Sequence, residues 1–380
     1  MLESRTRGAL LCLGLLSLGG SLRAKSLSRR INSIETSNNG STFVWTIEDT
    51  YSSENFFQLF NFFTGSDPTQ YVALFYTDAT TAFADGLAYV DGGVVVMKGD
   101  NTTQLAQGQF RNSVRVSSQK QYNTGLFILD VLRAPWGCGV WPAWWTLGGG
   151  IWPSTGEIDI IEGVHDNEHN QVTWHTGPNC TMTPTNNMTG SIVDINGQPN
   201  YDCNGSDNDN SGCGVTEWSR ASYGPTFDAQ GGGVFAMKWD EDGIAVWSFY
   251  RAAVPQDVVD GQPTPSTWGD PVAVLLPGGC DPITNFVNHS IIFDITFCGD
   301  WAGNTYNFTN CPGTCPEQLM NGSNFVNASW NINSLQVYRK QTLQGVISNG
   351  AHPDHILFRF HAWLQYLLAV ILATVIVHYY

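Results

Sequence analysis

The sequence predicts an all-β protein, a sandwich of the jelly-roll type, on three observations. Short segments rich in aromatic and β-branched residues alternate with clusters of Gly, Pro and Asn, as strands alternate with turns. No apolar periodicity in the central part of the chain supports a helix longer than two turns. Only 13% of the residues are charged and 40 are glycine, a composition typical of a turn-rich β-protein.

The strands are placed from the turn residues that flank them, and single strands are expected at 122–132, 171–176 and 290–297. Residues 233–251 predict a hairpin, because apolar runs flank the turn Asp240-Glu241-Asp242-Gly243. Residues 327–340 predict a closing strand that returns to the core. No Pro- or Ser-rich linker and no internal repeat divides the chain, so we expect one domain at 35–340.

The N-terminus has the pattern of a secretory signal peptide. Arg5 and Arg7 precede an apolar run over residues 9–18, and small residues follow. We therefore expect residues 1–24 to be a signal peptide and the protein to be secreted. The formal net charge of −16, with no basic stripe, argues against a nucleic-acid partner.

The C-terminus carries a second targeting pattern. Residues 362–380 form a hydrophobic tail, and the small residues 348–351 lie upstream within a spacer at 341–361. A small attachment region, a spacer and a terminal apolar tail are typical of a GPI-attachment signal. A membrane span is the alternative, since an apolar run of this length can cross a bilayer. Either anchor predicts a cell-surface protein, held at the plasma membrane or wall, whose only membrane contact is this C-terminal segment.

Cysteines and glycosylation sequons fit secretion. Loss of Cys12 with the signal peptide leaves eight cysteines, an even number that favours disulfides over zinc binding. Cys203–Cys213 and Cys311–Cys315 are close enough in sequence to close short loops, but the spacing does not fix the pairing. Nine Asn-x-Ser/Thr sequons predict a glycosylated surface: Asn39, Asn101, Asn179, Asn187, Asn204, Asn288, Asn307, Asn321 and Asn327.

The segment from Glu157 to Glu162 holds the candidate catalytic carboxylates. Side chains alternate along a strand, so Glu157 and Asp159 share a face, whereas Glu162 would lie on the opposite one. A β-bulge at 160–161 supplies the extra residue that returns Glu162 to the carboxylate face. Buried carboxylates repel one another, and such clustering is tolerated where catalysis needs carboxyl groups with separated pKa values. A solvated edge strand is disfavoured by the apolar neighbours such as Ile158, and a calcium site is a further alternative.

Residues 156–163, Gly-Glu-Ile-Asp-Ile-Ile-Glu-Gly, resemble the E-x-D-x-x-E signature of glycoside hydrolase family sixteen in its bulged form. Further segments resemble the fungal laminarinase-like branch of that family, at 55–69, 111–115, 141–145 and 172–176. The resemblance extends from about 43 to 340 and implies a curved jelly roll with a concave substrate cleft. It also implies endo-hydrolysis of β-1,3- or mixed β-1,3/1,4-glucans.

The resemblance also implies residue roles. Glu157 would be the nucleophile, Glu162 the acid/base and Asp159 an auxiliary carboxylate that adjusts both. Such a double displacement retains the anomeric configuration and needs the nucleophile and acid/base about 5–5.5 Å apart. It requires no metal and no organic cofactor. The expected partner is a β-glucan polysaccharide, and the protein is expected to be a monomer.

Five further residues are candidates for substrate binding. Sugar rings present apolar faces, so glucan clefts combine aromatic platforms with hydrogen-bonding groups. Trp145, Trp152 and Trp301 resemble sugar-binding positions of the family, although core packing is the usual fate of a tryptophan. His175 could contact substrate or steady a carboxylate, or it could be structural. Arg115 resembles a position that reaches substrate hydroxyls, with a structural ion pair as the alternative.

Two other functions stay open at this point. A cell-wall transglycosylase would use the same fold and nucleophile but transfer the sugar to another sugar. A non-catalytic β-glucan-binding lectin could share the sandwich, but it would be expected to have lost one of the three acids.

Overall fold

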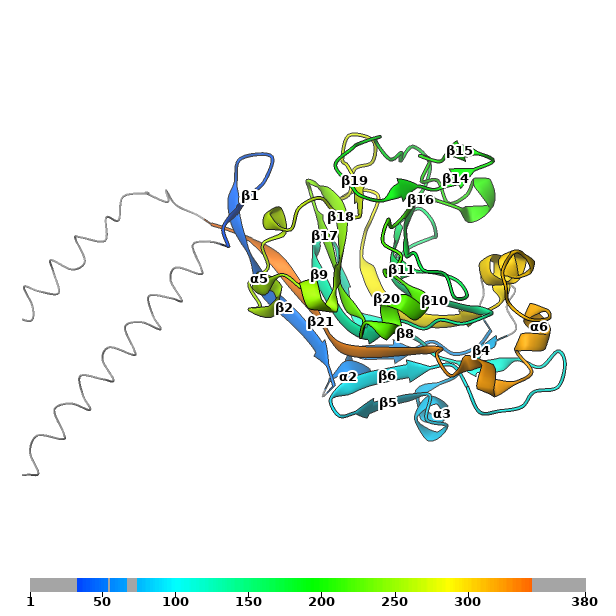
Figure 1. Ribbon diagram of the computed structural model, residues 1–380. Coiled ribbons are helices and arrows are strands. Elements are labelled where there is room, and N and C mark those ends of the chain that lie inside the picture. The colour runs from blue at the N-terminus through cyan, green and yellow to red at the C-terminus, as the bar shows by residue number, and fades with distance from the viewer. Residues whose placement is uncertain (1–32, 54, 67–73, 344–380) are drawn as a thin grey trace, which may run out of the picture. The chain divides into compact units, whose positions relative to one another are not determined.

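The computed structural model describes residues 33–53, 55–66 and 74–343 (Figure 1). The predicted signal peptide at 1–24, the hydrophobic tail at 362–380, nearly all of the spacer at 341–361 and Asp67-Pro68-Thr69 lie outside these residues. Among the described residues, no helix has the length and apolar character needed to span a membrane.

Two antiparallel sheets carry the described part of the chain. One has the strand order β1-β2-β21-β9-β17-β18-β19, with β6 beside β21 and β5 beside β6. Its strands are β1 (Glu35–Thr36), β2 (Thr42–Ser52), β5 (Ala88–Asp91), β6 (Val94–Lys98), β9 (Gly125–Arg133), β17 (Gly233–Asp240), β18 (Gly243–Tyr250), β19 (Ala273–Leu275) and β21 (Ser329–Thr342).

The second sheet holds the predicted catalytic strand and has the order β13-β16-β12-β11-β10-β20-β8-β3. Its strands are β3 (Phe60–Phe62), β8 (Arg115–Tyr122), β10 (Val140–Gly148), β11 (Glu157–Glu162), β12 (Gln171–His175), β13 (Ser191–Ile192), β16 (Cys213–Thr216) and β20 (His289–Phe297). Figure 1 shows β9, β17 and β18 of the first sheet beside β20, β10 and β11 of the second. The fold is the expected curled β-sandwich, with the main apolar core formed by residues of both sheets.

The remaining elements are small. Two strand pairs stand apart from the sheets: β4 (Leu74–Tyr76) with β7 (Arg111–Ser113), and β14 (Asp194–Ile195) with β15 (Gln198–Pro199). The α-helices are α2 (Phe56–Leu59), α3 (Ala79–Ala84), α4 (Gly224–Ala229), α5 (Gln256–Val259) and α6 (Cys315–Gln318). None of these described helices exceeds two turns, as the sequence predicts.

The predicted strands are found within one or two residues, with one exception. β12, β20 and β21 lie where expected, and β17 and β18 form the predicted hairpin around Glu241-Asp242. The predicted single strand at 122–132 is wrong at its start, because Tyr122 ends β8 and β9 begins only at Gly125. The turn at Asn123-Thr124 separates the two strands, and aromatic Tyr122 fits either of them.

All eight cysteines among the described residues form disulfides: Cys138–Cys311, Cys180–Cys280, Cys203–Cys213 and Cys298–Cys315. The Cys203–Cys213 pairing is confirmed and the Cys311–Cys315 pairing is wrong. Cys315 begins α6 and reaches the end of β20, whereas Cys311 reaches the loop before β10. Nearness in sequence permits a bridge but does not make two side chains point at each other.

Candidate active site

The bulge in β11 puts three carboxylates on one face of the sheet. Glu157 lies opposite His175 of β12, and Asp159 lies opposite Thr173. The register then shifts, so that Glu162 lies opposite Gln171 and two residues of β11 match one of β12. Residues directly opposite one another share a face, and the predicted bulge therefore returns Glu162 to the side of the other two acids.

The opposite face of β11 anchors the site in the core. Ile158, Ile160 and Ile161 are at most 1% exposed, and they belong to the apolar cluster that includes Trp144 and Trp174. Because these large side chains pack into the core on the opposite face of β11, the strand that carries the carboxylates is rigid.

A glycine sets the start of this strand. Gly156 has a positive φ of 81°, and a Cβ on it would meet the Asn285 carbonyl oxygen at 2.5 Å. Both constraints require glycine immediately before Glu157. The loop before it carries Trp152, which is 39% exposed and donates its indole N–H to Glu157 Oε2 at 2.9 Å.

Burial raises the pKa of Glu157 to about 8, and the charge of Asp159 adds to that rise. Three groups act in the other direction: His175, the Trp152 indole and Arg115 all favour the ionised carboxylate. His175 Nε2 lies 3.8 Å from Glu157 Oε1. Glu157 is thus the member of the cluster with the most support for a negative charge.

Asp159 is the most buried member. It is 3% exposed, and its pKa is raised well above its usual value, first by burial and then by the charge of Asp294. Its Oδ2 lies 3.2 Å from His175 Nε2, a distance at which a charged imidazole would offset this carboxylate. Asp294 of β20, also buried, is a fourth acid near the cluster that the sequence did not single out. An acid inside the apolar strand 289–297 was the available signal.

Glu162 has its own partners at the far end of the strand. Its pKa is raised well above its usual value by burial and by the charges of Asp159 and Glu157. Trp141 donates its indole N–H to Glu162 Oε1 at 2.8 Å, and the Trp301 ring packs edge-on against Trp141 at 5.9 Å. Trp301 therefore reaches the site through Trp141, which is not among the five residues that the sequence indicated as candidates for substrate binding.

Arg115 and Trp145 form a second group beside the carboxylates. Trp145 lies directly opposite Asp159 in β10, and the Arg115 guanidinium lies 4.9 Å from its ring centroid. The ring of Phe63 lies 5.0 Å from the same guanidinium. Stacking on two rings fixes this cation, and its charge lowers the pKa of Glu157. The indole N–H of Trp145 is buried and has no protein hydrogen-bond partner.

Asn170 is a site residue that sequence reasoning missed. Its Oδ1 accepts the Glu162 backbone N–H at 2.9 Å, and its Nδ2 donates to the Ile160 carbonyl at 2.9 Å. One amide thus satisfies the backbone groups on both sides of the bulge. An asparagine just before β12 looks like an ordinary loop residue, and no sequence signal connects it to residues 160–162.

Glu217 extends this network. It is 1% exposed, its Oε1 accepts from Asn170 Nδ2 at 3.0 Å, and its Oε2 accepts from Ser248 Oγ. Burial raises the pKa of Glu217 to about 7, and the two hydrogen bonds oppose the rise. The network links β18 of the other sheet to the bulge through Asn170.

Glu157, Asp159 and His175 could also hold a cation, since each offers one atom and these atoms lie within 4.8 Å of one another. A cation at this point would occupy the oxygens of Glu157 and Asp159 and would favour their ionised forms. The arrangement as it stands suits proton exchange between neighbouring carboxyl groups.

A family model described as XgeA-like, catalytic GH16 domain, matches residues 60–338. A Schizosaccharomyces pombe protein named as a probable glycosidase is 41% identical over 292 residues, covering 76% of this chain and 68% of that protein. An Arthroderma benhamiae endo-1,3(4)-beta-glucanase is 38% identical over 309 residues, covering 78% of this chain and 65% of that protein. An Aspergillus niger protein named as a probable endo-1,3(4)-beta-glucanase is 35% identical, and the chain spans 42% of its length.

Solved structures of GH16 proteins are also similar to this chain. Laminarinase 16A of Phanerochaete chrysosporium, a GH16 protein, is 40% identical with a TM-score of 0.73, covering 78% of this chain and all of that one. Its structure holds beta-glucans in both donor and acceptor sites. A protein described as an elongating GH family 16 beta-1,3-glucosyltransferase is 35% identical with a TM-score of 0.71 and the same coverage.

Proposed function

Because this chain belongs to glycoside hydrolase family sixteen, we propose that it is an endo-acting β-glucanase that cleaves β-1,3- or mixed β-1,3/1,4-linked glucans with retention. The observation that carries the proposal is the carboxylate face of β11, where Glu157 and Glu162 lie on either side of Asp159 in different electrostatic surroundings.

The surroundings of the two glutamates support an assignment of their protonation states. Glu157 receives support for its charge from Trp152, His175 and Arg115. Glu162 receives such support only from Trp141 and His175, and the charges of both Asp159 and Glu157 raise its pKa. The reactive form therefore has Glu157 ionised and Glu162 protonated, as a nucleophile and a general acid must be.

The reaction then proceeds in two displacements. Glu157 forms a bond to the anomeric carbon while the glycosidic bond breaks and Glu162 gives its proton to the leaving oxygen. The resulting ester removes the negative charge of Glu157, and that charge is one of the causes of the raised pKa of Glu162. The pKa of Glu162 falls accordingly, so it can accept a proton from the water that breaks the ester. Asp159 stays charged or shares a proton with its neighbours throughout.

The aromatic residues suit a polysaccharide substrate. Exposed Trp152 and the Arg115–Trp145 stack offer apolar faces together with N–H donors on the carboxylate side of the sheet. Trp141 and Trp301 provide a similar combination beside Glu162. We assign sugar binding to Trp145, Trp152, Trp301, His175 and Arg115 on this basis.

The test is turnover of laminarin and lichenan by the secreted domain, with the anomer of the first product followed by NMR. We expect reducing ends to appear with net retention, and activity to fall at least about 10³-fold in Glu157→Ala, because the nucleophile has no substitute. Inversion, or undiminished activity of the variant, would contradict the mechanism. Product analysis at high oligosaccharide concentration separates hydrolysis from glycosyl transfer.

We also propose that the protein is a monomeric, glycosylated, GPI-anchored enzyme of the cell surface. Four disulfides suit an oxidising compartment, and eight of the nine sequon asparagines are exposed or half-buried. Asn204 is the exception, since it is 9% exposed and its amide donates to Asp207 Oδ2, so we expect it to be unmodified. Mass spectrometry of the mature protein tests the anchor, and a peptide running through residues 362–380 would exclude GPI processing.

A further inference from the structure

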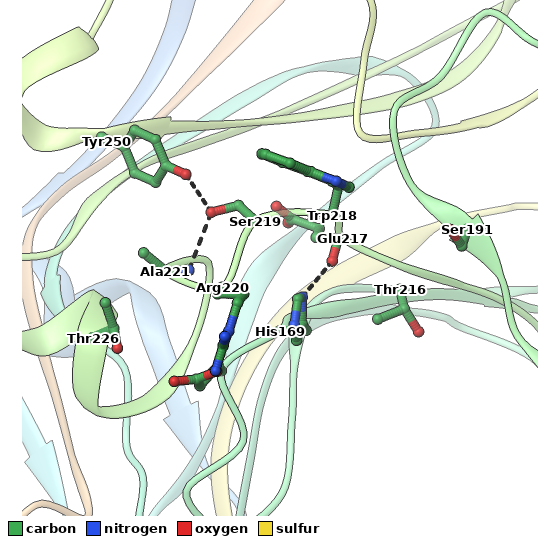
Figure 2. A pocket seen from close by; sticks show the side chains of 11 residues that line it. His169, Ser191, Thr216, Glu217, Trp218, Ser219, Arg220, Ala221, Thr226 and Tyr250 are labelled. Carbon is green, nitrogen blue, oxygen red and sulfur yellow. Dashed lines mark hydrogen bonds and ion pairs between the residues drawn. The ribbon is translucent and has the colours of Figure 1, made fainter.

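The described residues form a pocket that is lined by none of the five proposed sugar-binding residues (Figure 2). It has a volume of about 760 Å³ and surrounds the loop that follows β16. Its lining includes an aromatic pair, a cation and several hydroxyls: Trp218, Tyr250, His169, Arg220, Thr216 and Ser191. None of the three proposed catalytic carboxylates lines this pocket, although Glu217, which accepts a hydrogen bond from Asn170, does.

The indole of Trp218 is the unusual feature of the pocket. It is 76% exposed, whereas the next most exposed tryptophan among the described residues, Trp152, is 39% exposed. Tryptophan has a large apolar surface and is highly buried on average, so leaving this ring in water costs free energy. A large exposed aromatic surface beside a pocket is typical of a binding site.

The loop that carries Trp218 is held in place by its own contacts. The Tyr250 hydroxyl and Ser219 Oγ are in hydrogen-bond contact, and Ser219 Oγ also accepts the Ala221 backbone N–H at 3.1 Å, as Figure 2 shows. Arg220 pairs with Glu168 on the facing loop. These contacts hold the loop that carries Trp218, which reduces the backbone entropy lost when a ligand binds.

Strand pairing connects the pocket to the catalytic face. Glu162 lies opposite Gln171, and Gln171 in turn lies opposite Thr216. Thr216 lies opposite Ser191, and both line the pocket. Directly opposed residues share a face, and neighbouring strands are about 4.8 Å apart, so Thr216 is roughly 10 Å from Glu162 on the same side of the sheet.

We propose that the Trp218 pocket binds a glucose unit of the β-glucan chain remote from the cleaved bond, a unit that does not flank that bond. The inference rests on the proposed glucanase function and adds a specificity determinant to it. A polymer lying on the carboxylate face and running across β12 and β16 reaches Thr216 and Ser191 next, and then the Trp218 ring. The indole offers a face for a sugar ring, while Thr216, Ser191 and Arg220 offer partners for its hydroxyls.

The experiment measures kcat/KM on laminari-oligosaccharides of increasing length for the wild type, Trp218→Ala and Trp218→Phe. Tyr89→Ala is the matched control, since Tyr89 is an aromatic residue 40% exposed on β5 of the other sheet. Trp218→Ala should lower kcat/KM roughly tenfold on long substrates, which is the size expected when the apolar contact between one indole face and one sugar ring is lost. It should leave the shortest cleaved substrate unchanged, and Trp218→Phe should recover part of the loss.

Equal loss at every length, or no loss at any length, would overturn the proposal. The short substrate also reports folding, because a misfolded variant loses activity on it as well. If the wild type cleaves none of these sugars, the proposed function fails, but a binding measurement still tests whether the pocket holds a sugar. In the Glu157→Gln background, a long oligosaccharide should then bind roughly tenfold more weakly when Trp218 is replaced, and unaltered binding would refute the pocket.

Discussion

Replacing Asn170 with alanine tests whether the bulge in β11 is held by a single side chain. The amide makes hydrogen bonds of 2.9, 2.9 and 3.0 Å to the Glu162 N–H, the Ile160 carbonyl and Glu217. Removing it orphans the two backbone groups at the bulge. At roughly 1–3 kcal/mol for each, Asn170→Ala should lose about 2–6 kcal/mol of unfolding free energy.

The effect on catalysis should be specific to Glu162. A displacement of about 1 Å can cost a rate factor on the order of 10², so kcat/KM on laminarin should fall about 10- to 100-fold. An aryl β-glucoside with a good leaving group needs little protonation, and its kcat/KM should stay within about threefold of the wild type. Azide, a nucleophile that needs no general base, should accelerate breakdown of the glycosyl-enzyme in the variant.

Glu217→Gln is the matched control. Glutamine can still accept from Asn170 Nδ2 and can donate to Ser248 Oγ, so both side-chain hydrogen bonds of Glu217 have a replacement. This variant should therefore resemble the wild type on both substrates. If Asn170→Ala lost kcat/KM equally on laminarin and on the activated glucoside, the side chain would be supporting the fold as a whole and not Glu162, and the reasoning would be refuted.

Three further predictions follow from the same contacts. Glu157→Gln should have a higher melting temperature than the wild type, by a margin that grows from pH 4.5 to about pH 8. The folded state binds the proton of the Glu157 carboxyl more tightly than the unfolded state, so wild-type stability falls as pH rises through that range. A difference in melting temperature that is the same at every pH would contradict this prediction. Arg115→Gln should move the acidic limb of the kcat/KM–pH profile to higher pH, since the guanidinium lowers the pKa of Glu157. An unmoved limb would show that Arg115 has no effect on the ionisation of Glu157. The double variant Cys203→Ser/Cys213→Ser should lose about 3 kcal/mol in urea unfolding, the entropy of closing a short loop, and an unchanged midpoint would exclude a structural role for the bridge.

The sequence could predict what depends on local geometry. Alternation along a strand fixes the shared face of Glu157 and Asp159, and the three-residue step to Glu162 requires a bulge if that acid is to join them. The hairpin at β17–β18 follows from its turn residues in the same way. These predictions need only the order of neighbouring residues.

The contacts that support the site depend on register between distant segments. Glu217 meets Asn170 only because β16 pairs with β12, and Ser248 reaches Glu217 from the other sheet. Their residue types are common in loops, so nothing in the sequence marks them. The Cys311–Cys315 error has the same origin, since the partner of each cysteine is set by how the segment packs on β10 and β20.

The carboxylates alone do not decide between hydrolysis and transfer. In the proposed mechanism both reactions pass through the same ester on Glu157, and they differ in whether water or a sugar hydroxyl receives the base catalysis of Glu162. The chain is similar to a laminarinase and to an elongating glucosyltransferase at comparable identity, so the fold does not decide either. What remains is how firmly a second sugar is held beside Glu162. In this chain we expect that to depend on Trp141, whose indole N–H contacts Glu162, so Trp141 variants should change the product ratio, whereas variants of Asp159 should change the rate of both reactions.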